Sequence, residues 1–454
     1  MSSWELDATA FELMLDAAIL GVALLVATGL RRHVGFLQRY LVPNALVAGA
    51  VGLAVGPEVA GLVPIDVDRM GTYVYHLLAL TFICVGLKGT GGKKTFAAVH
   101  LGFMQVMCML LQALVGLAIL LGVLFFVDAT VTPAAGMLLP LGFAMGPGVA
   151  YSIGDSWAAF GFAEGASVGL TLAALGFLAA YSVGVAVVHR SGHSAGELPE
   201  SVRTGFRSRA ERTVAGHLTL SPGAVEPLAV HLGLVAMVYA LTYAAATGLA
   251  AGLETAGRPQ EVPVIWSFHF ILANLTALLV RRGLIATGAS DVLDSGLLDR
   301  LTGVMADFLI AASIMAISLG IAWRYALPIV LMAVAGTVVT FAALRFTSRR
   351  IFKEFEFERF VGMFGEMTGT VTSGLALIRI LDPEYRSPVA QDLVLSSGVA
   401  LALGFPLLAL INLPLTGFDG RVEGYLVMMG ILVGYLALAL AAWRFYFRRH
   451  AKAA

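Results

Sequence analysis

Two glycine-rich stretches hold the residues of this chain that could do chemistry. The first, "LGFAMGPGVAYSIGDSW", ends at Trp157, and the second, "VGMFGEMTGTVTSGLAL", begins at Val361. Each interrupts an apolar run with glycine, and the first adds proline. Glycine lets the backbone approach a ligand, proline removes a donor, and a helix that starts after such a break presents free N-H groups to an anion. The stretches therefore predict the two lips of a site for a carboxylate.

The predicted substrate residues are the two tips and the polar side chains next to them, with one amide from another helix: Gly146, Pro147, Gly148, Tyr151, Ser152, Thr368, Gly369, Thr370, Thr372, Ser373 and Asn274. Free carbonyls and the threonine and serine hydroxyls could equally coordinate a hard cation such as Na+. The predicted Na+ ligands are Asp307, Asp155 and Thr370. Asn274 can offer a donor and an acceptor to an amino-acid-like ligand, or bridge two helices.

An ionisable residue within an apolar span is a functional hypothesis by default. Asp307 could bind Na+, carry a proton or form a structural pair. Asp155 and Glu366 could each bind a cation, although Glu366 could also be a solvated lip near the inner surface. Asp16 is expected to be wet, close to the outer surface. Arg379 could clamp a carboxylate, or pair with Asp382 or Glu384 near the cytoplasmic mouth.

The composition places these residues in a membrane protein. Of the 454 residues, 59% are hydrophobic and 13% charged, and the mean hydropathy is +0.87. One soluble core could not bury this much apolar surface. The formal net charge of +0 argues against a nucleic-acid partner. Cys84 and Cys108 lie in apolar runs and predict neither a disulfide nor a metal site, and we expect no cofactor beyond a coupling ion.

Apolar runs of spanning length predict an all-α polytopic fold. We expect helices near 11–30, 43–63, 71–87, 96–127, 166–188, 226–251, 264–280, 301–320, 326–344, 391–412 and 421–446. The polar segment 189–225 is predicted to be a cytoplasmic linker. The glycine-broken segments 134–162 and 359–381 are expected to be re-entrant hairpins.

The distribution of Lys and Arg supports re-entrance. With the N-terminus outside, only Arg69, Arg258, Arg324 and Arg421 lie on the outer side, which leaves 29 − 4 = 25 basic residues on or toward the cytoplasm. Residues 1–188 and 226–412 then form two inverted five-helix repeats, each with one hairpin. Residues 413–454 add a C-terminal transmembrane helix and a basic cytoplasmic tail.

The layout and the motifs "GFAMGPGVAYSIGDSW", "SVGLTLAALGFLAAYSVGV" and "GEMTGTVTSGLALIRILDPEYRSPVAQDL" resemble the sodium/glutamate symporter family, in its divergent branch. The resemblance covers roughly Phe11 to Asn412. It implies Na+ coupling, a multi-pass location in the bacterial inner membrane and a homodimer. By position it places the hairpin tips at Gly146-Pro147-Gly148 and Thr368-Gly369-Thr370. The first tip departs from the Gly-Gly-His-Gly-Thr-like pattern of typical members.

These observations favour a secondary transporter rather than an enzyme. The first hypothesis is Na+-coupled symport of glutamate or a related carboxylate by alternating access, with membrane lipid as the surroundings. A second keeps the fold but couples another organic anion to protons through Asp307 or Asp155. A third is an intramembrane aspartyl hydrolase, although Ser152 stands where a Gly-x-Gly-Asp motif needs glycine.

Overall fold

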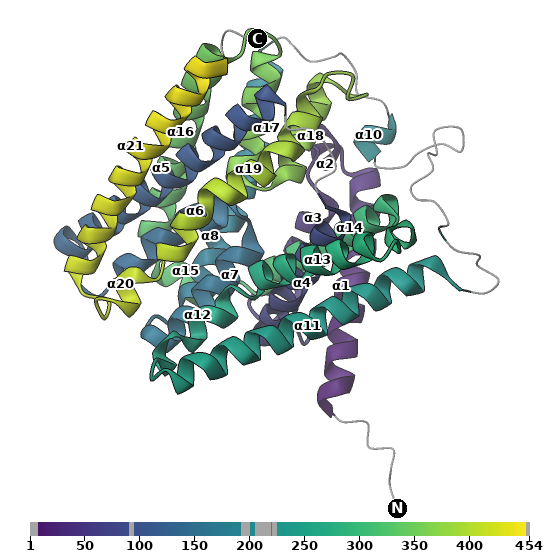
Figure 1. The fold of residues 1–454 in the computed structure, drawn as a ribbon, viewed down its shortest axis with the longest axis horizontal. Helices are drawn as coiled ribbons and strands as arrows, with labels where there is room; N and C mark the ends of the chain where they lie inside the picture. Colours follow the sequence, from purple (N-terminus) through teal and green to yellow (C-terminus); the bar gives the residue numbers. More distant parts are fainter. Residues whose placement is uncertain (1–7, 90–94, 192–199, 205–218, 220–224, 451–454) are drawn as a thin grey trace, which may run out of the picture. The chain divides into compact units, whose positions relative to one another are not determined.

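The computed structural model describes residues 8–89, 95–191, 200–204, 219 and 225–450, and the secondary structure of this part is helical, without strands (Figure 1). The all-helical prediction is confirmed for these residues. Most of the predicted linker 189–225, the N-terminal residues 1–7 and the last residues of the basic tail, 451–454, lie outside the described residues.

Within the described part, nine helical segments are long and apolar enough to cross a membrane. They are α1 (Ala8–His33), α4 (Val67–Lys88), α5 (Phe96–Phe126), α8 to α9 (Gly165–Arg190), α11 (Pro227–Thr255), α13 (His269–Ala286), α16 (Ala326–Ile351), α19 to α20 (Val389–Thr416) and α21 (Val422–His450). Shorter helices are α2 (Gly35–Arg39), α3 (Asn44–Val55), α10 (Glu200–Thr204), α12 (Val262–Ser267) and α15 (Leu319–Arg324).

Two predicted spans differ from the sequence expectation. The helix expected over 43–63 ends at Val55, because Gly56 adopts extended backbone before Pro57, a residue that disfavours helix at the position preceding it. The remaining 12 residues of α3 span only about 18 Å, short of the roughly 30 Å of a hydrocarbon core. The helix expected over 301–320 is α14 (Ser295–Met315), which contains Asp299, Arg300 and Asp307 and is not among the nine.

Several helices begin where a polar side chain caps free backbone donors. The carboxylate of Asp66 accepts from the N-H of Arg69 at the start of α4, and Asp294 accepts from Leu297 at the start of α14. Thr95 does the same for α5. Such caps satisfy N-H groups that have no partner in the first helical turn. The polar residues between the apolar runs therefore fix where the spans start.

The chain folds into two compact units, and neither is a continuous stretch of sequence. Unit 1 comprises Met1–Gly91, Tyr151–Ser156 and Thr204–Leu319, and unit 2 comprises Gly92–Ala150, Trp157–Arg203 and Gly320–Ala454. Each unit therefore draws on both predicted repeats. The repeat boundaries at 188, 226 and 412 and the inverted relation of the repeats stay predictions.

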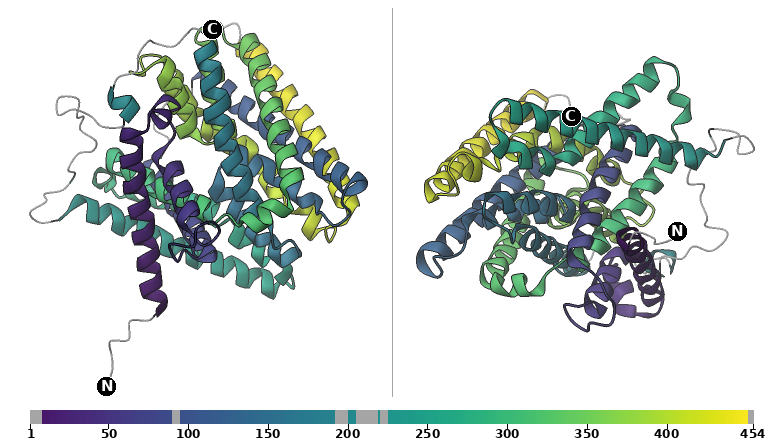
Figure 2. Two further views of the ribbon diagram at one scale, coloured as in Figure 1. Left: turned by 180° about the vertical axis from the view of Figure 1, so that it is seen from behind. Right: turned by 90° about the horizontal axis from the view of Figure 1, so that it is seen from below.

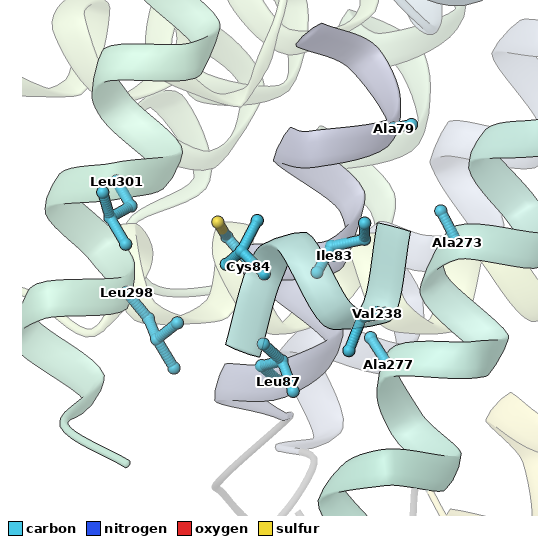
Figure 3. Close-up of a cluster of buried hydrophobic side chains, with 10 residues drawn as sticks. Ala79, Ile83, Cys84, Leu87, Val238, Ala273, Ala277, Leu298 and Leu301 are labelled. Carbon is cyan, nitrogen blue, oxygen red and sulfur yellow. The ribbon is translucent and has the colours of Figure 1, made fainter. Parts of the chain in front are cut away.

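Unit 1 is held together by an apolar core between α4, α11, α13 and α14. Figure 3 shows four side chains of α4 in this core, Ala79, Ile83, Cys84 and Leu87, with residues of the other three helices around them: Val238, Ala273, Ala277, Leu298 and Leu301. Val235 on α11 belongs to the same core. Small alanines on α13 let this helix approach α4 closely, where Gly86 faces Ala277. α1 and α3, the purple helices of Figure 2, pack side by side in the same unit.

Asp16 is fully buried in unit 1, so the expectation that it is wet is wrong. Its carboxylate accepts a 2.6 Å hydrogen bond from Nε of Arg69. Nη1 of the same guanidinium lies 3.1 Å from the carboxylate of Glu12 and 3.4 Å from that of Asp66. A buried carboxylate persists when a cation pairs with it. Asp16 and Arg69 therefore join α1 to the start of α4.

In unit 2, the 31-residue helix α5 packs against α16, α19 and the C-terminal α21 (Figure 1). Close approach of backbone holds α5 to the 3-10 turn Pro133–Met137, because a Cβ at Gly116 would lie 2.0 Å from the carbonyl oxygen of Gly136. The last helix is anchored by Trp443, whose indole N-H donates to Nδ1 of His100 at 2.6 Å. α21 thus belongs to the packing of unit 2.

Candidate functional site

The first glycine-rich stretch forms two helices with a break between them. α6 (Leu138–Ala144) ends before Met145, and α7 (Pro147–Ser156) starts after Gly146, whose φ of +85° lies in the left-handed region that favours glycine. The carbonyl of Gly146 accepts from the N-H of Ala150 at 3.2 Å. Pro147 has no N-H to offer, so the backbone donors left free at this helix start are those of Gly148 and Val149.

The second stretch has the same plan. α17 (Glu356–Thr368) ends just before Gly369, Thr370 is extended, and α18 (Val371–Leu381) follows. Gly374 donates to the carbonyl of Thr370 at 3.1 Å, which leaves the N-H groups of the first three residues of α18 outside the intrahelical pattern. The hydroxyls of Thr370 and Thr372 bond each other at 2.7 Å. The second break therefore presents three backbone donors and a pair of hydroxyls.

The two breaks meet within unit 2. A Cβ built on Gly146 would lie 3.4 Å from Cγ2 of Thr370, an ordinary van der Waals contact. Each break is followed by a helix of at least ten residues that starts there. The positive ends of two helix dipoles and their free N-H groups thus lie close together, an arrangement suited to an anion.

Residues of several neighbouring helical segments, among them the π-helical turn Ala180–Gly184, support the second break. The amide of Gln112 on α5 donates to the carbonyl of Met367 at 2.9 Å and to the hydroxyl of Thr340 on α16 at 2.9 Å. A Cβ at Gly176 on α8 would lie 2.4 Å from the carbonyl oxygen of Thr368. Tyr181 donates to the hydroxyl of Ser373 at 3.1 Å. Sequence reasoning missed Gln112, Gly176 and Tyr181; the available signal was the pair of glutamines, Gln105 and Gln112, in the apolar run of α5.

The other predicted site residues belong to unit 1. Ser152 donates to the carbonyl of Ser267 at 2.8 Å and lies 3.4 Å from Nδ1 of His269, whose ring stacks on Tyr75. The hydroxyl end of Tyr151 lies against Gly71. The side chain of Asp155 is exposed, and Asp68 at the start of α4 is its electrostatic neighbour.

Asn274 and Asp307 lie on different helices of unit 1, α13 and α14. The Asn274 backbone forms the close approach between α13 and α4, since a Cβ at Gly86 would lie 2.9 Å from its carbonyl oxygen. Asp307 is exposed. Among the described residues, no hydrogen bond or ion pair engages the side chain of Asp155, Asn274 or Asp307. The structure thus brings the tip residues together in unit 2, while Asp155, Asn274 and Asp307 belong to unit 1.

Glu366, one turn before the second break, is buried at 4% exposure, so the interpretation of a solvated lip is wrong. One carboxyl oxygen accepts from the hydroxyl of Ser397 at 3.1 Å, and the other finds no hydrogen-bond partner in the part of the chain that the structure describes. α17 packs this side chain inward against α5 and α19. The alternative of a cation-binding carboxyl stays open.

The end of the second hairpin segment is a compact polar turn. Asp382 accepts from the backbone N-H groups of Arg386 at 3.0 Å and Ser387 at 2.8 Å. Partial burial raises the pKa of Asp382, but these hydrogen bonds outweigh it, and its pKa lies below the usual value. Glu384 pairs with Arg386. Arg379 instead places its guanidinium 6.0 Å from the ring of Tyr385.

The helical architecture and the nine apolar helices of the described residues define an α-helical polytopic membrane protein. No protein-family model matches the chain, and no curated protein matches it. The resemblance to the sodium/glutamate symporters therefore stays a prediction from the motifs.

Proposed function

We propose that this protein is a secondary active transporter that binds a small organic anion where its two broken hairpins meet. The supporting observation is the proximity of Gly146 to Thr370, where a Cβ on Gly146 would lie 3.4 Å from Cγ2 of Thr370, so that two helix starts and their free N-H groups lie near each other. Broken helices in corresponding places of two inverted halves are the strongest sequence pointer to a transporter's substrate site. An anion held by backbone donors at two helix starts is recognised by its charge, as a carboxylate is.

The proposed substrate is glutamate or a related carboxylate, and the proposed coupling ion is Na+. The candidate ligands are the hydroxyls of Thr370 and Thr372 in unit 2 and, separately, the carboxylates of Asp155 and Asp307 in unit 1, for which the described residues offer no ion-pair partner. Oxygen ligands of this kind suit a hard cation. The neighbouring acid Asp68 adds to the negative potential at Asp155. Na+ bound first would raise the affinity for the anion, a coupling that must be reciprocal.

The proposal includes re-entrance of both hairpins, a location in the bacterial inner membrane with a periplasmic N-terminus and a cytoplasmic C-terminus, and a homodimer. The proposed mechanism is alternating access, in which a transporter moves one rigid part against another. Unit 2, which holds the two tips, is the proposed mobile part.

The test is thermal unfolding of the purified protein with a panel of amino acids and dicarboxylates, each in Na+ and in choline. A substrate at 100 times its Kd should stabilise the native state by about 2.7 kcal/mol, and we expect this only in Na+. Thr370→Val should reduce the shift, whereas Thr337→Val should not, because that hydroxyl only bonds the carbonyl of Ala333 in its own helix. Stabilisation that is indifferent to Na+ but depends on pH would favour proton coupling through Asp307 or Asp155. No response to any anion would contradict a carboxylate site.

A further inference from the structure

The carboxyl of Glu366 is the most deeply enclosed acid near the second break. It lies on α17 two residues before Thr368, where the helix ends, at 4% exposure. Ser397 on α19 donates to one oxygen at 3.1 Å, and the other oxygen has no hydrogen-bond partner among the described residues. Gln105 on α5 is the second polar neighbour. The amide of Gln105 also donates to the hydroxyl of Ser396 at 2.8 Å.

No cation compensates this carboxyl within the described residues. The titratable groups on the elements packed against α17, and on α17 itself, are His100, Cys108, Tyr181, Arg345, Arg349, Arg350, Glu356, Glu358, Arg359, Arg379 and Asp392. Several are already engaged: Arg359 pairs with Asp392, Arg345 with Glu356, and Trp443 bonds His100. The groups that interact with Glu366 are the hydroxyl of Ser397 and the amide of Gln105.

Burial of a charged carboxylate without a cation is strongly unfavourable, and the hydroxyl of Ser397 and the amide of Gln105, both neutral, do not replace its lost hydration. The neutral acid avoids this cost. We propose that Glu366 is a proton-binding site of the second hairpin, occupied by a proton while α17 packs against α5 and α19. The step is a simple proton transfer. The acid gives its proton to water when the carboxyl becomes hydrated and takes one back before it is enclosed again.

The position of Glu366 links this proton to the second break. A Cβ at Gly374 on α18 would lie 3.3 Å from the backbone nitrogen of Glu366, so α17 and α18 are in close contact at Glu366. Hydration of the carboxyl requires α17 to separate from Ser397 on α19 and Gln105 on α5. Any such movement also displaces the carbonyl of Met367, which Gln112 holds at 2.9 Å. Proton release and displacement of the tip are therefore coupled. This coupling to transport rests on the proposed function, while the proton site itself does not.

The first experiment is infrared spectroscopy of the purified protein in detergent at neutral pH. Wild type should show the C=O stretch of a protonated carboxylic acid, and Glu366→Gln, which keeps the shape of the neutral acid, should lose that band. Glu358→Gln is the matched control, because Glu358 lies on the same helix but is only partly buried; it should retain the band. A wild-type spectrum without the band, or a band unchanged in Glu366→Gln, would overturn the proposal.

The second experiment measures the unfolding temperature against pH for the same three proteins. A group that binds its proton more tightly in the folded state than in the unfolded state makes the folded state less stable as pH rises. Wild type and Glu358→Gln should therefore lose unfolding temperature with rising pH by a larger amount than Glu366→Gln. If the unfolding temperature changed equally with pH in all three proteins, a proton site at Glu366 would be contradicted. The same conclusion would follow if Na+ stabilised wild type and Glu366→Gln abolished that stabilisation.

Anion binding separates this inference from the proposed function. If Glu366→Gln loses the infrared band and no anion stabilises any of the three proteins, the proton site stands and the transporter proposal fails. If an anion stabilises all three but the band does not depend on Glu366, the proton site fails and the transporter proposal stands. If both hold, proteoliposomes containing Glu366→Gln should show a loss of substrate-driven proton movement relative to Glu358→Gln, and equal proton movement would overturn the coupling.

Discussion

Removal of one partner from the buried ion pair between Arg359 and Asp392 is predicted to destabilise unit 2 strongly. The guanidinium Nη2 donates to Asp392 at 2.8 Å, and the two side chains are only 8% and 3% exposed. Thr95 donates to the other carboxylate oxygen at 2.6 Å. An Asp392→Asn variant keeps one oxygen and replaces the other with an NH2 group. Its side chain can therefore accept from Arg359 or from Thr95 but not from both. An unpaired buried guanidinium costs about 3–5 kcal/mol.

The assay is unfolding of the purified protein by SDS in mixed micelles, applied as a double-mutant cycle. Arg359→Met and Asp392→Leu should each lose about 3–5 kcal/mol, and the double variant should lose far less than their sum, because no charge is then left unpaired. The exposed pair Arg386–Glu384 is the control, with 80% and 67% exposure. It should contribute no more than about 1 kcal/mol. Additive losses at the buried pair, or single losses below about 1 kcal/mol, would refute the reasoning.

Three further changes test other contacts by the same unfolding measurement. Gly146→Ala should lower the free energy of unfolding by about 1–2 kcal/mol, because alanine is strained at a φ of +85°, and not because its side chain is crowded. An unchanged free energy of unfolding would contradict a left-handed backbone at this break. Trp157→Phe should lower the free energy of unfolding by about 1–3 kcal/mol, because the indole N-H donates to buried Asn412 at 2.7 Å. An unchanged free energy of unfolding would show that water takes over this hydrogen bond. The depressed pKa of Asp382 contributes stability that is present above the unfolded value of about 3.9 and is lost as the pH falls through the lower folded value. Asp382→Asn should therefore destabilise at neutral pH and flatten the loss in acid, and an unchanged acid profile would contradict this.

The apolar runs predicted most of the helices because spanning length and hydrophobicity are local properties of the chain. The helix ends were less predictable. The end of α3 at Val55 follows from Pro57, because the residue before a proline disfavours helix; a hydrophobic average over 43–63 obscures this signal. The early start of α14 follows from the cap at Asp294. Both errors arise where one polar or conformationally restricted residue overrides the average of its neighbours.

The two breaks of the candidate site were predictable because glycine and proline mark them directly. Their support was not. Gln112 and Tyr181 contact the second hairpin from helices far away in sequence, and burial of Glu366 depends on α5 and α19 packing over it. The division into units was equally hidden, since contacts such as Lys88 with Asp299 join residues of both halves. Local pattern cannot show which distant helix covers a given face.

The way the chain alternates between the two units has a consequence for biosynthesis. The core of unit 1 joins α4 to α11, α13 and α14, so Ile83 and Cys84 are covered only when helices more than a hundred residues downstream have been made. Unit 2 in turn is completed by α19 and α21 at the C-terminal end. Contacts between distant segments form slowly, and apolar surface that waits for them is exposed to wrong partners. Neither unit can therefore complete its core while only the first half of the chain has been synthesised. A chain truncated after α9 would lack part of the core of both units.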